Sequence, residues 1–413
     1  MKITSDKILT LIIYLGFTSV SSVTSLQELQ TDAIAHKGVR LASIGLAFFL
    51  SFSICCLRSP LHYLTGKTIF PLFLYFCAAA ITTFWSLVPS LTMFKCIELS
   101  LVILLGLIGI SLKNTKSYEL FDLIIIVFSI QLVIVWVEAF LFPNLAFRIV
   151  RGTTPLLGSM LQGVYPILNP NTIGFIGGII AVSYFPRVLS NSKIFRSENI
   201  LFLLGMSAVI ASYSRGALLA SGVVILMFCV INRNYKLILF FILISLGLFL
   251  LDKNIIINHL QRGKEYKDLA TFSSGRTNIW DLVVEHFSVF TFGQGYAVGF
   301  RSNHFLGNTN AHNNIFEILT GSGVLGVLAW LLMYFNIFSR FLFCYTQQYK
   351  IDNHFFSILN STIYLFLSSF TNVRGVYLDY GMLLFVAIVV YLEKTPRLTS
   401  NTKSLKPLVT SFP

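Results

Sequence analysis

Three side chains in polar segments of this apolar chain could together bind a phosphate and accept a proton. His312 stands in AHNN directly before an apolar stretch, Arg215 lies in SYSRGA, and Arg276 lies in SSGRTNIW. A neutral imidazole can accept a proton near pH 7. An arginine fork can hold two oxygens of one phosphate. This combination indicates base-assisted chemistry on an anionic substrate.

His312 precedes the predicted helix by one or two residues, and its neighbours Asn310, Asn313 and Asn314 are good N-cap residues. The positive end of that helix would disfavour an imidazolium and keep His312 neutral, as a base requires. The alternative is an exposed loop histidine beside a capping residue. Position alone leaves the two open.

Arg215 lies in a very short turn between two apolar segments. It could extend to the membrane interface with no further role. Alternatively, its guanidinium and the hydroxyl groups of Ser212, Tyr213 and Ser214 could together bind a phosphate. We favour the phosphate, because topology disfavours a positive charge on the outer side.

Arg276 lies at the start of a predicted helix that Ser273 or Ser274 could cap and that runs toward His286. One side of this helix is apolar and carries Ile279, Val283 and Phe287. A cation is unfavourable in a first helical turn, which indicates a ligand. The alternative is a helix on the membrane surface with Trp280 as its interfacial anchor.

The composition places these residues in a membrane protein. Hydrophobic residues make up 55% of the 413 residues and charged residues 11%, which is too apolar for a soluble domain. A crossing helix needs about 20 apolar residues. We expect one all-α polytopic domain, 1–413, with about 12 spans: 8–24, 38–57, 67–88, 92–112, 120–141, 169–189, 199–213, 216–231, 236–252, 315–339, 354–371 and 375–393. The first could be a signal peptide, but further spans follow at once, so we expect it to remain uncleaved.

Lysine and arginine placement predicts the orientation. With the N-terminus inside, more than half of the 30 Lys and Arg residues fall in inner segments. Both termini, including the tail 394–413, are therefore expected in the cytoplasm, and the loop 253–314 outside. The net charge of +13 then reports topology. No soluble basic face for nucleic acid is apparent.

Other ionisable residues also gather near the outer ends of the spans. Glu317 opens the tenth predicted span, and Arg374 with Asp379 opens the twelfth. A transporter would instead place charges near the bilayer midplane. This distribution favours an enzyme at the membrane surface over a flippase or another transporter, which remains the alternative from a different class.

Several familiar motifs are absent or misleading. GSGVLG (Gly321 to Gly326) copies a dinucleotide fingerprint, but it lies in an apolar helix and follows no strand, so helix packing explains it better. The two glycines of GQGY indicate a turn. The sequence contains no HExxH, Walker, CxxC or GxSxG motif and no Asp-x-Asp pair, and no cysteine lies in a predicted outer loop. We therefore expect no metal and no cofactor.

The order of the motifs resembles the O-antigen ligase and polymerase superfamily of bacterial membrane glycosyltransferases. FWSLVPS, NPNTIG, SRGALLA, SGRTNIW, GQGY and AHNNIFEILTGSGVLG follow one another over most of the chain. The resemblance implies about a dozen helices in a GT-C-like arrangement and an outer loop with short helices between two late spans. It also implies the bacterial inner membrane, with the active site facing the periplasm.

The resemblance further implies transfer of a glycan from undecaprenyl pyrophosphate to an acceptor hydroxyl, without a metal. His312 would accept the acceptor proton, Arg215 would hold the pyrophosphate, and Arg276 and, more weakly, Arg301 would assist. Supporting residues would be Ser214, Asn313 and Glu317.

The acceptor defines the two activities that compete within the family. A polymerase extends another carrier-linked unit, whereas a ligase moves the chain to lipid A-core. We lean slightly to a polymerase, with a chain-length regulator as a possible partner, because the chain shows no additional acceptor-binding domain.

Overall fold

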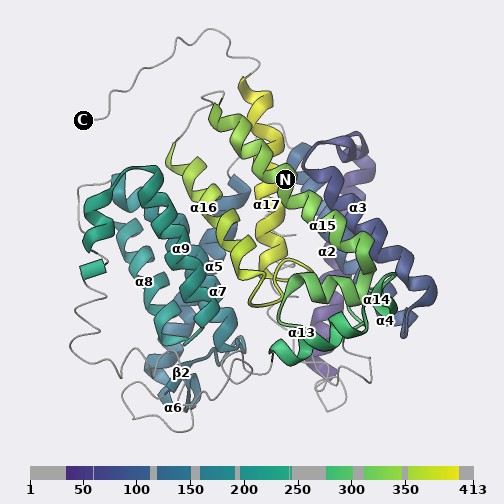
Figure 1. The fold of residues 1–413 in the computed structure, drawn as a ribbon, viewed down its shortest axis with the longest axis horizontal. Helices are drawn as coiled ribbons and strands as arrows, with labels where there is room; N and C mark the ends of the chain where they lie inside the picture. Colours follow the sequence, from purple (N-terminus) through teal and green to yellow (C-terminus); the bar gives the residue numbers. More distant parts are fainter. Residues whose placement is uncertain are drawn as a thin grey trace, which may run out of the picture.

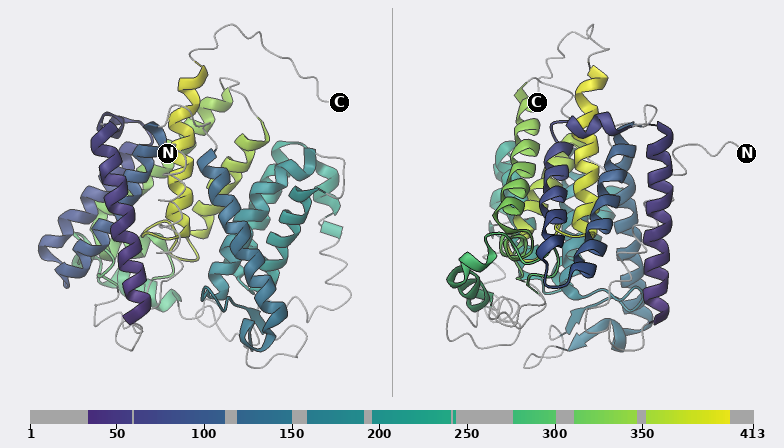
Figure 2. Two further views of the ribbon diagram at one scale, coloured as in Figure 1. Left: turned by 180° about the vertical axis from the view of Figure 1, so that it is seen from behind. Right: turned by 90° about the vertical axis from the view of Figure 1, so that its right-hand side faces the viewer.

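The computed structural model is a bundle of helices with short loops and one small β-hairpin (Figures 1 and 2). It describes residues 34–58, 60–111, 119–149, 159–190, 196–240, 242–243, 276–300, 311–346 and 352–399. The predicted span 8–24, most of the predicted span 236–252, and Arg301 lie outside the described residues.

The helices of the first half follow the expected spans. They are α2 (Ile34–Arg58), η1 (Pro60–Thr65), α3 (Ile69–Ile81), η2 (Thr82–Trp85), α4 (Pro89–Ser111) and α5 (Glu119–Leu141). The predicted span 67–88 is shorter than expected, because α3 tightens into the 3-10 turn η2 after Ile81. There Thr82 Oγ1 donates to Ala79 O (2.6 Å) and accepts from Tyr296 N (3.0 Å). A contact distant in sequence thus ends the helix.

A short helix and a two-stranded hairpin follow α5, and neither was expected in an all-α chain. They comprise α6 (Pro143–Ala146), β1 (Phe147–Ile149) and β2 (Ser159–Leu161), with Phe147 paired to Leu161. The buried Glu138 at the end of α5 accepts from Val164 N (2.8 Å) and Tyr165 N (2.6 Å). The Glu138 carboxylate thus holds the chain that leads from the hairpin to α7.

One side of the bundle is formed by α7 (Pro170–Ser190), α8 (Ser197–Ala211) and α9 (Arg215–Ile231) (Figure 1). A Cβ on Gly205 would lie 2.6 Å from Gly177 O, so the two helix backbones approach as closely as glycine permits. Asn169 caps α7 by accepting from Thr172 N (2.9 Å). The NPNTIG motif therefore opens α7, as the sequence predicts.

The last third contains α13 (Arg276–Glu285), α14 (Phe287–Phe290), α15 (Asn314–Thr346), α16 (Asn353–Ser368) and α17 (Tyr380–Thr399). Non-helical dihedral angles at Gly323 (φ 71°) break α15. The last predicted span starts too early, because residues 375–379 form a loop. Gly375 has a left-handed φ of 69°, and Asp379 Oδ1 accepts from Met382 N (2.7 Å), which starts α17.

Four of the described helices are long and apolar enough to cross a membrane: Pro89–Ser111, Glu119–Leu141, Pro170–Ser190 and Asn314–Thr346. Shorter apolar helices at Ala42–Cys56, Ile69–Trp85, Ser197–Ala211 and Arg215–Ile231 accompany them. The apolar helices match an all-α membrane protein, and the expected number of 12 spans stays a prediction. Helices α16 and α17 meet in a loop that brings the motifs together (Figure 1).

Candidate active site

The loop TNVRG (Thr371 to Gly375), between α16 and α17, is the hub of the candidate site. It receives side chains or close backbone contacts from α7, α9, α13 and the start of α15. Ser369, just before the loop, accepts from Asn314 N (2.9 Å). Segments far apart in sequence are thereby joined at one end of the bundle, which we call the His312 end.

The residue before His312 is clamped on both sides of its backbone. Ala311 N donates to Glu317 Oε2 (2.8 Å), and Ala311 O accepts from Trp280 Nε1 (2.9 Å). Ala311 is fully buried, and the Trp280 ring stacks on Phe316 with centroids 5.7 Å apart. The backbone then turns through a left-handed φ of 53° at His312. That conformation is unfavourable for a residue with a Cβ, so its surroundings must enforce it.

Both asparagines after His312 fix the helix start, as expected of N-cap residues. Asn313 Oδ1 accepts from Ile315 N (2.8 Å), and its Nδ2 donates to Phe370 O (3.4 Å). The Asn314 amide exchanges two bonds with the Arg374 backbone, accepting from N (2.8 Å) and donating to O (2.6 Å). The AHNN motif is thus bonded directly to the hub loop.

Arg276 is brought to the same loop by the first turn of α13. Its Nη1 donates to Thr371 O at 2.5 Å. The acceptor is a neutral carbonyl, which leaves the charge of the guanidinium uncompensated by this bond. The Trp280 indole is half-buried, stacks on Phe316 and uses its N–H within the protein, and its alternative role as a membrane anchor stays a prediction.

The predicted apolar side of this helix is only partly correct. Val283 is buried and Ile279 packs beside it, but Phe287 is 49% exposed. The helix is interrupted at His286, whose ψ of 26° ends α13 and starts α14 in a new direction. Phe287 therefore leaves the face that Val283 occupies.

The SRG and NPNTIG motifs meet the hub through glycines. A Cβ on Gly216 would overlap Thr371 Oγ1, so the backbone beside Arg215 lies against the hub loop. A Cβ on Gly174 would lie 2.5 Å from Ser214 Cβ, which joins the starts of α7 and α9. Ser214 is buried at this junction, and Arg215 is half-buried in the first turn of α9. The turn before α9 is as tight as expected, with Tyr213 at φ 52°.

Arg374, a residue of the hub loop, connects the loop to the start of α7. The residue is 9% exposed, and its guanidinium donates from Nη2 to Thr172 Oγ1 (3.1 Å) and lies 4.7 Å from the centre of the Phe175 ring. Arg374 therefore holds the beginning of α7 against the loop that contacts His312 and Arg276.

Burial and a neighbouring cation keep His312 neutral. Desolvation, then the charge of Arg276, lower the pKa of His312 to about 4, and a hydrogen bond with Asn372 opposes the shift. The expectation of a neutral ring agrees with this direction. The cause differs from the expected helix dipole. An imidazole in this state can accept a proton throughout the neutral range.

A second layer braces Glu317 and the hub. Tyr377 Oη donates to Glu317 Oε1 (2.5 Å), and Glu317 is 1% exposed. Tyr296 of GQGY donates to Val376 O (2.7 Å), and its ring centre lies 5.3 Å from that of Tyr377. The Glu317 carboxylate thus links this tyrosine pair to the backbone that carries His312.

The GSGVLG segment packs differently from the expectation. Gln294 N donates to Thr320 O (2.8 Å), and Gly295 N donates to Gly321 O (3.0 Å). The small residues of GSGVLG leave room for the GQGY turn to pack against α15 at its break. The sequence predicted that another helix would pack there. Gly293 and Gly295 have φ values of 72° and 117°, so GQGY is a turn, as expected.

The sequence identified most of the converging motifs but missed the hub. His312, Arg276, Arg215, Ser214, Asn313 and Glu317 were expected at the site, and the structure places all of them on segments that contact TNVRG or each other. Thr371 and Asn372 were not identified. The signal was the polar run TNVRG between two apolar stretches, which contains Arg374 and is followed by Asp379.

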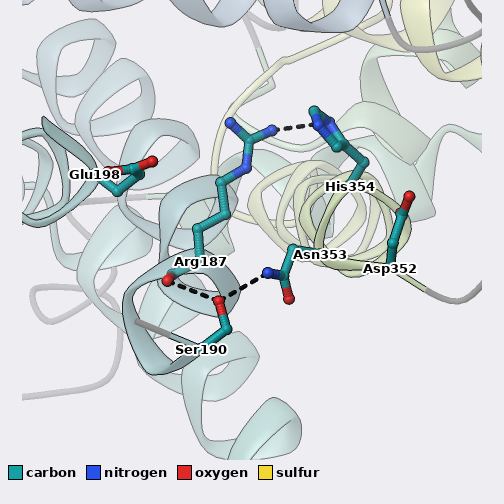
Figure 3. Close-up of a pocket in the computed structure, with 6 residues that line it drawn as sticks. All are labelled: Arg187, Ser190, Glu198, Asp352, Asn353 and His354. Atoms are coloured by element: carbon teal, nitrogen blue, oxygen red, sulfur yellow. Dashed lines mark hydrogen bonds between the residues drawn. The ribbon is translucent and has the colours of Figure 1, made fainter. Parts of the chain in front are cut away.

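A second polar cluster lies at the other ends of α7 and α16 (Figure 3). Arg187 Nη2 contacts Asp122 Oδ1 (3.1 Å) and His354 Nδ1 (3.0 Å). A cavity of about 330 Å³ lies beside it, lined by Arg187, Ser190, Glu198, Asp352, Asn353 and His354. Arg187 is 15 residues beyond Thr172 on α7, or about 22 Å along the helix.

The arrangement defines a helical membrane protein with a buried, cation-rich loop site at one end of its bundle. Residues 200–331 match the family model described as O-antigen ligase. This match supports the resemblance to the O-antigen ligase and polymerase superfamily inferred from the motifs. Members of this family are glycosyltransferase-like enzymes. The match includes Arg215, Arg276 and His312 and ends before the hub loop. No curated protein matches the chain.

Proposed function

We propose that this protein transfers a glycan from a polyprenyl pyrophosphate carrier to an acceptor sugar hydroxyl at the outer surface of the bacterial inner membrane. The observation that supports this best is the joining of His312 and Arg276 at one loop, with Arg215 on the adjoining turn. A neutral base close to two cations matches the needs of this reaction.

In this proposal, His312 accepts the proton of the acceptor hydroxyl as its oxygen attacks the anomeric carbon. The bond from that carbon to the pyrophosphate oxygen breaks, and the electron pair leaves with the pyrophosphate. Attack opposite the leaving group inverts the anomeric configuration. General-base assistance typically contributes ~10²–10⁴-fold in rate.

Arginines stabilise the departing pyrophosphate in the role that a metal has in other transferases. Arg276 is positioned by its bond to the Thr371 carbonyl, and Arg215 adds a second cation. Preorganised charges of this kind stabilise a transition state without reorganisation. Arg301, outside the described residues, is proposed as a weaker third. We propose that no cofactor participates.

The proposed reaction is polymerisation, in which a carrier-linked chain is moved onto another carrier-linked unit. The test is a surface-glycan gel from a deletion strain carrying wild type, His312→Ala, Arg276→Ala or Arg215→Ala at equal expression. We expect only wild type to restore long chains, with a single repeat on the core in each variant strain. A bare core with accumulating carrier-linked chains would make the protein a ligase. Normal glycan from all three variants would contradict the enzyme proposal and favour a flippase or another transporter.

A further inference from the structure

Large apolar side chains gather on the surface at the His312 end. Phe84 and Leu87 of the FWSL turn are 87% and 51% exposed, and Phe287 and Phe292 around α14 are 49% and 74% exposed. We call these four residues the apolar rim. Exposed aromatic patches of this kind mark a contact with another apolar phase.

The parts of the rim are joined rigidly. Trp85 Nε1 donates to Gly293 O (2.9 Å), and Leu87 N donates to Gln294 O (3.0 Å). The FWSL turn therefore lies along the segment that follows Phe292. Two exposed surfaces distant in sequence are thus one surface in the fold.

The rim continues the lipid-facing side of a membrane helix. Helix α15 carries an exposed apolar stripe at helical spacing: Leu325, Leu328, Leu332 and Phe335. Val324 N donates to Thr291 O (2.9 Å), which brings the start of this stripe to Phe292. Since α15 is one of the helices able to cross a membrane, the surface that lipid covers leads directly onto the rim.

The position of α13 and α14 fits this continuity. Both helices stand out to one side of the bundle at the His312 end (Figure 2, right). The half-exposed indole of Trp85 has its N–H bonded within the protein and its ring at the rim. Tryptophan and phenylalanine at the end of crossing helices are typical of a membrane interface.

We propose that the apolar rim is immersed in the headgroup–acyl boundary of the bilayer leaflet at the His312 end. The partner is the phospholipid surface itself. Because α13 starts at Arg276 and leads into α14, this immersion holds the Arg276 guanidinium near the depth of lipid phosphates. That consequence rests on the proposed function, in which Arg276 meets the pyrophosphate of a membrane-bound carrier.

Depth-dependent fluorescence quenching tests the immersion. The full chain, with its six cysteines replaced and glycan restoration verified, receives one environment-sensitive label at Phe292→Cys. Asp281→Cys on the exposed polar side of α13 is the water control, and Leu328→Cys is the lipid control. The samples are reconstituted with phospholipid spin-labelled near the headgroup end of the acyl chain.

We expect the label at residue 292 to lose about half its emission, as an interfacial helix would, with little loss at residue 281. Quenching at 328 without quenching at 292 would overturn the proposal. So would a label at 292 that is shielded from both lipid and water, because another part of the chain or a second copy would then cover the rim.

A second measurement tests the link to Arg276. Phe292→Glu should reduce long-chain glycan at least about tenfold at equal expression, since a charge at the interface lifts α14 out of the lipid, whereas Phe292→Leu should restore it. Full restoration by Phe292→Glu would refute the depth role. Failure of the proposed function would give a different result. Arg276→Ala and His312→Ala would then produce normal glycan, while the quenching at residue 292 would be unaffected.

Discussion

The bundle contains two histidine–arginine pairs at opposite ends, and their surroundings differ in charge. At the His354 end, Arg187 contacts the imidazole (3.0 Å; Figure 3) and also the Asp122 carboxylate (3.1 Å). At the His312 end, Arg276 donates to the carbonyl of Thr371 and lowers the pKa of His312. The first arginine contacts its histidine and a carboxylate, whereas the second acts on its histidine through its charge.

This difference separates a structural cluster from a reactive site. Asp122, Arg187 and His354 come from α5, α7 and α16, so their contacts tie three helices together. The side chains of Arg187 and Asp122 are 21% and 29% exposed. Ion pairs with this exposure contribute little to stability, about 1 kcal/mol or less. Arg276, by contrast, lowers the pKa of His312, which is the effect of a cation whose charge is still felt. An anionic ligand would gain most at the His312 end.

The largest expected effect comes from removing the two histidines separately. His312→Ala should lower the rate of glycan transfer by ~10²–10⁴-fold, because it removes the proposed base. His354→Ala should change the rate less than about twofold, because His354 belongs to a partly exposed ion pair away from the proposed site. Rates are measured with reconstituted protein and a carrier-linked donor. Similar losses for both variants would show that the two ends do not differ as argued.

The next comparison removes the arginines. Arg276→Gln should lower kcat by about 10²-fold, the usual loss for one preorganised donor to a developing anion. Arg187→Gln should keep kcat and lower only the free energy of unfolding, by about 1 kcal/mol. Steady-state kinetics and thermal unfolding in detergent separate these outcomes. A loss of kcat in Arg187→Gln would contradict its structural role.

Two capping carboxylates sharpen the comparison further. Glu317 holds the Ala311 N–H beside His312, whereas Asp352 Oδ1 accepts from Phe355 N (2.9 Å) at the start of α16. Glu317→Ala should lower kcat by up to about 10²-fold through misplacement of His312, with KM for the donor little changed. Tyr377→Phe should give a smaller loss, because it removes only one of the two bonds to the carboxylate.

Asp352→Ala is the matched control for this pair. It should cost about 1 kcal/mol of stability, as the loss of an N-cap does, and leave kcat unchanged. If Glu317→Gln and Glu317→Ala both keep full kcat and a normal pH profile, Glu317 does not position His312.

The smallest expected effect is a shift in pH dependence. Since the pKa of His312 is about 4 in the free protein, kcat/KM should be constant through neutral pH and fall only as the pH drops through about 4. Arg276→Gln removes the cation that lowers this pKa, so the acid limb should move to higher pH. Residual activity of the variant suffices for this measurement. An acid limb at the ordinary histidine value of 6.5 in wild type would contradict the buried state of His312.

Much of the helical arrangement was predictable because apolar runs are long and their ends are marked. Asn169 before Pro170 and the asparagines after His312 predict helix starts, and the structure has helices beginning there. One error arises where a distant contact decides the end, since Tyr296 N donates to Thr82 Oγ1 where α3 ends. The other is local. Residues 375–379 read as the start of a span, yet Asp379 caps α17 and Gly375 takes a left-handed turn.

The candidate site shows the same division. His312, Arg215 and Arg276 stand out in the sequence because a charged or titratable group in a short polar segment is costly in a membrane protein. Thr371 gave no such signal, because its contribution is a backbone carbonyl. Trp280 gave an ambiguous signal, since an aromatic side chain suits both an interface and the bond to Ala311 O that the structure shows.

The sequence alone determined that the chain is an apolar helical protein and which side chains could do chemistry, because hydrophobic run length and residue type are local properties. Only the tertiary structure decided that TNVRG joins the motifs, that Glu317 clamps the backbone before His312, and that Arg276 bonds the Thr371 carbonyl while Arg187 meets a carboxylate. Those outcomes depend on which groups become neighbours after packing, and on how far burial removes them from water.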